Sequence, residues 1–219
     1  MQVQNLRGIQ SFEVNDNMIF VQAPVASVGE LFHHLYSGRW ERDVYGREIQ
    51  DVDSGFIMMQ FQGHSWTIIC EPNFTNSCRR EEDAQTLSRL LNTRTICYYA
   101  SDTCGEFSYE VYQAGTCVEK LVGDYDVGFT LESQLRSPEI IQGPHGFIDT
   151  FFREQGIYVP VLFYSLSLGK QINERKLIIK LYQSVIVDIL DPERSVPFFQ
   201  RSDFERVDFF ALSEVSTTM

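Results

Sequence analysis

The chain has 219 residues, of which 43% are hydrophobic, and its 30 acidic against 18 basic residues give a formal net charge of −12. This length and apolar content suffice for an ordered core without disulfide or metal staples. The negative charge would repel nucleic-acid phosphates and anionic lipid headgroups, so we expect neither a nucleic acid nor a membrane as partner.

The cysteines and the start of the chain both favour a reducing compartment. The five cysteines form an odd set without a CxxC pair, which is typical of reduced thiols rather than of a disulfide framework. The N-terminus lacks the basic segment, apolar core and small-residue cleavage site of a signal peptide. No window approaches the roughly eighteen apolar residues of a membrane-spanning helix. We therefore expect a cytoplasmic protein.

The first third of the chain predicts a strand, a helix and a hairpin. Residues 18–22 form an apolar, β-branched run that ends at an Ala-Pro pair. A helix is expected over 27–36, because Ser27 and Glu30 have the spacing of a capping box and apolar residues follow at helical period. Residues 56–70 read as two strands around a central glycine turn, which is typical of a β-hairpin.

The middle of the chain predicts a polar loop, a helix and a meander. Residues 72–83 are rich in asparagine, arginine and acidic residues and indicate a surface loop. Asp83 is a candidate N-cap for a helix over 84–91, whose leucines share one face. Three β-rich segments between 95 and 121, separated by turn residues, then predict an antiparallel meander.

The last third of the chain predicts a connecting segment followed by helical and extended elements. The stretch 124–146 is rich in glycine, serine and proline, which indicates a connecting segment. A short amphipathic helix over 147–152 and an extended segment over 158–168 follow. Residues 174–191 contain many β-branched residues, yet their polar residues recur every three or four positions, so we predict a helix. Residues 204–212 form the last predicted element.

This succession of elements predicts an α+β fold, with a mainly antiparallel sheet and helices packed on one of its faces. We expect a sheet-and-helix domain over 1–123, a connecting segment over 124–146 and a C-terminal α+β portion over 147–219. That last portion is either a smaller subdomain or part of the same domain.

The sequence contains no phosphate-binding loop, dinucleotide fingerprint, zinc-protease helix or CxxC cluster, so we expect no cofactor and no metal. An active site, if there is one, must therefore assemble from dispersed residues. The candidates for such a site are His64 in the hairpin turn, Asp102 and Cys104 after the first meander strand, and His145 between two turn-forming residues.

Two sets of residues are candidates for binding a partner. The acidic run Glu81, Glu82 and Asp83 ends the predicted polar loop, where its charges would be exposed. Tyrosines recur along the meander, and if one face of the sheet is open some of them must face outward. Alternatively, helices cover these rings. The tyrosines concerned are Tyr98, Tyr99, Tyr109 and Tyr112.

Absent catalytic motifs and strong negative charge together favour a non-enzymatic, cytosolic protein-binding or regulatory protein. An inhibitor or an immunity-type factor directed against a basic protein partner would have these properties. Two alternatives remain open. One is an enzyme with a dispersed active site, and the other is a small-ligand binding module with an aromatic-lined cavity between sheet and helices.

Overall fold

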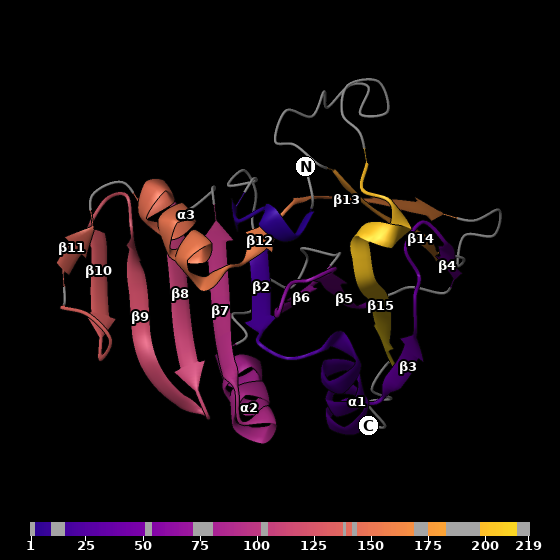
Figure 1. Ribbon diagram of the computed structural model, residues 1–219, viewed down its shortest axis with the longest axis horizontal. Coiled ribbons are helices and arrows are strands. Elements are labelled where there is room, and N and C mark those ends of the chain that lie inside the picture. Colours follow the sequence, from indigo (N-terminus) through magenta and orange to yellow (C-terminus); the bar gives the residue numbers. More distant parts are fainter. Residues whose placement is uncertain are drawn as a thin grey trace, which may run out of the picture.

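The computed structural model describes residues 3–9, 16–50, 54–71, 81–101, 105–137, 139–141, 144–168, 175–182 and 198–213. Its centre is a ten-stranded sheet in the order β11-β10-β9-β8-β7-β2-β6-β5-β15-β3, in which every neighbouring pair is antiparallel (Figure 1). The strands are β2 (Asp16–Val21), β3 (Gly38–Glu41), β5 (Gly55–Phe61), β6 (Thr67–Cys70), β7 (Arg94–Ser101), β8 (Glu106–Gln113), β9 (Thr116–Asp124), β10 (Gly128–Ser133), β11 (Glu139–Ile141) and β15 (Phe204–Leu212).

Two smaller sheets and three helices complete the described fold. The antiparallel sheet β13-β14-β4 contains Val161–Leu168, Arg175–Tyr182 and Glu48–Gln50. The parallel pair β1-β12 contains Gly8–Ile9 and Tyr158–Val159. The helices are α1 (Val25–Leu35), α2 (Glu81–Leu91) and α3 (Pro144–Gln155), with short 3-10 turns η1 (Val3–Asn5) and η3 (Arg201–Asp203). In the part of the chain so described, no helix is both long and apolar enough to cross a bilayer.

The predicted α+β class with a mainly antiparallel sheet is confirmed, but the helices cover both faces of the sheet rather than one. Adjacent residues of β2 point to opposite faces, and both are buried, Ile19 at 2% and Phe20 at 0% exposure. The Ile19 face packs against α1 and α2. The opposite face packs against α3, where the rings of Phe20 and Phe152 lie 4.9 Å apart. A sheet that is apolar on both faces needs a cover on each.

The predicted helix over 174–191 is wrong for the residues that the structure describes there. Residues 175–182 are strand β14, which pairs with β13 along its whole length. Leu177, Ile179 and Leu181 are buried and alternate with half-exposed residues, so the burial has the two-residue period of a strand. Pairing with a neighbouring strand thus outweighs the weak three-to-four-residue spacing of the polar residues. Residues 183–191 lie outside the described part.

The first two predicted helices begin earlier than expected. Helix α1 begins at Val25 after Pro24 and has no side-chain cap, so the predicted capping box of Ser27 and Glu30 does not form. A proline fixes the backbone for a helix start without a side-chain acceptor. Helix α2 begins at Glu81, so the acidic run stands in its first turn, where the helix dipole favours negative charge.

Other local predictions are confirmed. Strands β5 and β6 form the predicted antiparallel hairpin, and β7, β8 and β9 form the predicted meander. The helix predicted over 147–152 is α3, which is longer (Pro144–Gln155) and is followed by Gly156, whose φ of +72° is a left-handed conformation that favours glycine. The final strand, β15, spans 204–212 as predicted.

Strands from all three predicted portions of the chain share the large sheet (Figure 1). The stretch 124–146, predicted as a connecting segment, contains β10 and β11, and both pair within this sheet. From the predicted C-terminal portion, β15 lies between β5 and β3. A strand from the end of the chain therefore supports the position of β3 near its beginning.

Candidate functional site

The two described histidines among the catalytic candidates lie in separate surroundings. Half-buried His64 has Nε2 3.0 Å from the carbonyl oxygen of Val3, and burial lowers the pKa of its imidazole. His145 stands in the first turn of α3, where it bonds to the hydroxyl of Tyr125 and its ring lies 4.8 Å from that of Phe107. Asp102 and Cys104 lie outside the described residues, so the structure does not place the four together.

The expectation of outward-facing tyrosines is wrong for Tyr98, Tyr109 and Tyr112, which are at most 4% exposed. Tyr99 is half-exposed. The physical reason is that both faces of the sheet are covered. Helix α3 covers the face that holds Tyr109, whose ring stacks on Phe151 at a centroid distance of 4.2 Å. Three of the four rings are therefore core residues.

The acidic residues predicted to bind a partner lie in the first turn of α2. Asp83 accepts a hydrogen bond from the hydroxyl of Tyr36 at the end of α1, so it joins the two helices on that face of the sheet. Glu82 is exposed, whereas Glu81 and Asp83 are half-exposed. That these acids bind a basic partner stays a prediction.

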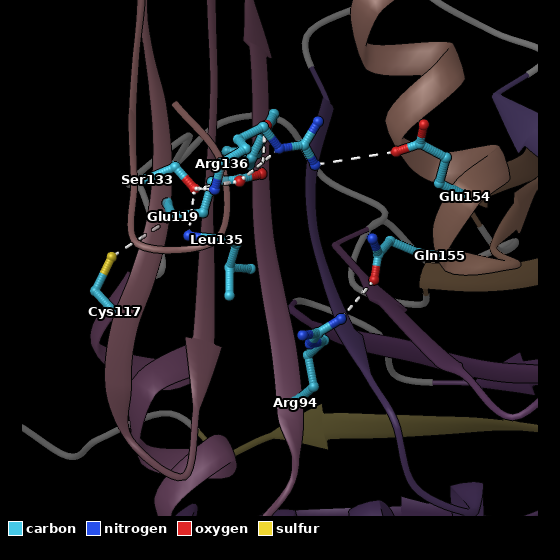
Figure 2. A network of polar contacts seen from close by, with 9 residues as sticks. Arg94, Cys117, Glu119, Ser133, Leu135, Arg136, Glu154 and Gln155 are labelled. Carbon is cyan, nitrogen blue, oxygen red and sulfur yellow. Dashed lines mark hydrogen bonds and ion pairs between the residues drawn. The ribbon is translucent and has the colours of Figure 1, made fainter. Parts of the chain in front are cut away.

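A buried carboxylate, Glu119 on β9, is the centre of a polar network (Figure 2). It accepts hydrogen bonds from the hydroxyls of Tyr109 (2.9 Å) and Ser133 (2.7 Å) and from Nε of Arg136 (2.9 Å). Nη2 of Arg136 also lies 4.0 Å from Glu154 on α3. Burial and the nearby carboxylate both raise the pKa of Tyr109. The network ties α3 to the sheet, which is a structural role.

A second buried carboxylate, Glu110 on β8, bonds to the Tyr112 hydroxyl and to Nζ of Lys120. The thiol of Cys117 lies nearby on β9. Burial raises the pKa of this thiol, and the Glu110 charge raises it further. Cys117 therefore stays protonated at neutral pH, which is the opposite of an activated nucleophile.

A surface cavity of about 560 Å³ lies between α1 and β3. It is open to solvent, because most of its lining residues are exposed. The lining combines imidazoles, guanidinium groups and an indole with one carboxylate, and it consists of Glu30, His33, His34, Gly38, Arg39, Trp40 and Arg42.

The indole of Trp40 is fixed in this cavity by a buried acid. Its ring N–H donates to Oδ2 of Asp208, which is fully buried (2.9 Å). Oδ1 of Asp208 accepts the backbone N–H of Asp43 (3.0 Å) and lies 2.8 Å from Nε of Arg206. One carboxylate from β15 therefore holds both Trp40 and the turn that follows β3. The ring cannot turn without breaking a buried hydrogen bond.

Gly29 in α1 provides the space for this ring. A Cβ atom at that position would lie 2.6 Å from Cε2 of Trp40 and still nearer to Cζ2, so no larger residue fits while the ring stays in place. Glycine inside a helix costs about 1 kcal/mol relative to alanine. The helix tolerates this cost where the indole approaches its backbone.

The guanidinium of Arg42 lies over the indole, with Cζ 4.0 Å from the ring centroid. Such cation–π contacts hold a guanidinium in place while its N–H groups remain available. Arg39, by contrast, is engaged by Glu41 (2.9 Å) and by the carbonyl of Gln50 (2.7 Å). With Arg39 paired to Glu41, the guanidinium of Arg42 and the carboxylate of Glu30 are the other charged groups of the lining.

None of the residues that line this cavity was among the site residues predicted from the sequence. The signal that could have found it is the run Arg39-Trp40-Glu41-Arg42, in which cations interleave with an aromatic residue. The run is too short to separate a binding site from an ordinary exposed strand. The residues that fix it come from far away in the chain, since Asp208 is 168 positions from Trp40.

Comparisons of the chain with protein-family models, with curated proteins and with solved structures found no match.

Proposed function

We propose that this is a non-enzymatic binding protein that holds an anionic group of its partner against Arg42 and Trp40. The observation that carries the proposal is the exposed guanidinium of Arg42, stacked 4.0 Å from the centroid of an indole that a buried carboxylate fixes. Tryptophan and arginine are the residues that contribute most to binding energy in protein interfaces. A pre-positioned pair loses little freedom when a ligand arrives.

The guanidinium of Arg42 supports an anionic occupant. A guanidinium presents two parallel N–H groups that match a carboxylate or a phosphate. Two imidazoles on α1, His33 and His34, add further ring N–H groups at the rim.

The buried acids support binding rather than catalysis. Glu110, Glu119 and Asp208 each bond to at least one cationic partner in the described part of the chain, and none of them lines the cavity. A general base needs access to a substrate proton. We keep the class of function expected from the sequence as a proposal, with a surface that presents a guanidinium and a partner that is acidic.

Titration of tryptophan fluorescence tests the proposal. The chain contains two tryptophans, Trp40 and buried Trp66, so Trp66→Phe leaves Trp40 as the single reporter. A capped tetraglutamate peptide should change this fluorescence saturably, and a capped tetralysine peptide should not. Arg42→Gln should weaken binding about tenfold or more, because a charge-assisted hydrogen bond contributes roughly 1.5–3 kcal/mol.

The matched control is Arg89→Gln, which removes the same charge from an exposed position on α2. Affinity should be unchanged in this variant. If both variants bind the peptide as tightly as the unchanged cavity does, the cavity is not the recognition site and the proposal fails.

A further inference from the structure

The geometry points to an extended acidic polypeptide segment as the occupant, added as an extra strand along the outer edge of β3, where no described strand pairs. This inference rests on the proposed function and specifies its partner. It requires an edge with unpaired backbone groups, charges of the right sign beside that edge, and a ligand backbone that can form the ladder.

Strand β3 is the last strand of the large sheet, and within the described residues only β15 pairs with it (Figure 1). Its four residues are Gly38–Glu41. A backbone hydrogen bond from Ser213 N to Ser37 O (3.0 Å) shows that these two residues form a hydrogen-bonded pair between β15 and β3. Because bonded and non-bonded pairs alternate in an antiparallel ladder, Arg39 and Glu41 direct their backbone groups toward β15.

The backbone groups of Gly38 and Trp40 therefore point away from β15, to the outer edge. They offer two N–H and two C=O groups to an incoming strand. The arrangement suits a polypeptide, whose own N–H and C=O groups repeat at the same spacing along the strand. A nucleic acid or a lipid headgroup could pair with the charged side chains but could not form these repeating backbone hydrogen bonds.

The side chains beside this edge favour acidic residues in the added strand. The side chain of a residue opposite Trp40 would project on the same face as the indole, because cross-strand neighbours share a face. That face carries the cavity and the guanidinium of Arg42. A glutamate or aspartate there would meet Arg42 directly, whereas the other face presents the ion pair of Arg39 and Glu41.

Calorimetric titration of the unmodified chain with short capped peptides tests strand addition. The probes are N-acetylglutamate amide, the pentapeptide Val-Glu-Val-Glu-Val with capped ends, and two versions of this peptide with N-methyl groups on alternate residues. N-methylation removes backbone donors and leaves every side chain in place. The unmethylated peptide should bind at least tenfold more tightly than the single residue.

One of the two methylated peptides should lose affinity at least tenfold, because its altered residues face β3, whereas the other should bind like the parent. If both bind like the parent, strand addition is overturned and the proposed anion site stands. If the single residue binds as tightly as the pentapeptide, the partner is a small anion. If none of the probes binds, the proposed function falls together with this inference.

Discussion

Removal of Arg136 should destabilise the fold strongly, because it would leave the Glu119 carboxylate buried without its cation. In Arg136→Met the methionine keeps the apolar length of the side chain but cannot pair. Glu119 would retain hydrogen bonds from the hydroxyls of Tyr109 and Ser133. Two neutral donors do not compensate a buried charge.

The magnitude follows from the burial of the two partners. The Glu119 side chain is 0% exposed, whereas that of Arg136 is 32% exposed. Breaking a fully buried pair costs roughly 3–5 kcal/mol, and partial solvation of the cation places this pair at the lower end, about 3 kcal/mol. Tyr109→Phe removes one hydrogen bond from the same carboxylate and should cost about 1 kcal/mol.

Urea unfolding followed by circular dichroism measures both costs as changes in the free energy of unfolding. The double variant Arg136→Met with Glu119→Gln should be less destabilised than the sum of the two single variants, since the unpaired charge is gone. A cost below about 1 kcal/mol for Arg136→Met would be typical of an exposed ion pair. That result would refute the structural role of the network.

Further predictions concern the indole and the half-buried histidine. Gly29→Ala should displace the Trp40 ring, shift its emission and weaken peptide binding, as fluorescence in the Trp66→Phe background would show; an unchanged spectrum would contradict the tight packing. Burial lowers the pKa of His64 in the folded state, so the unfolded chain binds its proton first as pH falls. This contribution lowers stability below about pH 6.5, the unfolded value, and is absent above it. The free energy of unfolding should therefore differ less between pH 7.5 and 5.5 in His64→Gln than in the unchanged protein. An equal difference would show that His64 does not contribute to the pH dependence.

The elements that the sequence predicted correctly depend on local patterns. The hairpin of β5 and β6 and the meander of β7–β9 each show β-rich segments bounded by turn residues. Strand β14 was mistaken for a helix because its identity depends on pairing with β13 and β4. Its β-branched residues favoured a strand, but the spacing of its polar residues was given more weight in the prediction.

The candidate site was hidden for a related reason. Trp40 becomes a fixed platform only because Asp208, near the other end of the chain, bonds to its indole, and because Gly29 gives it room. Conversely, Tyr98 and Tyr109 were candidates for outward-facing rings, but they are buried beneath α3. Sequence patterns report which residues are apolar or aromatic, whereas exposure depends on which elements pack over them.

The most direct test of the proposed site is the titration of Trp40 fluorescence with capped tetraglutamate, in Trp66→Phe and in Trp66→Phe with Arg42→Gln. We expect saturable binding that weakens with added salt and falls about tenfold or more when Arg42 is replaced. A fluorescence signal that does not respond to the acidic peptide, or that responds equally in both proteins, would contradict recognition of an anion by Arg42 and Trp40.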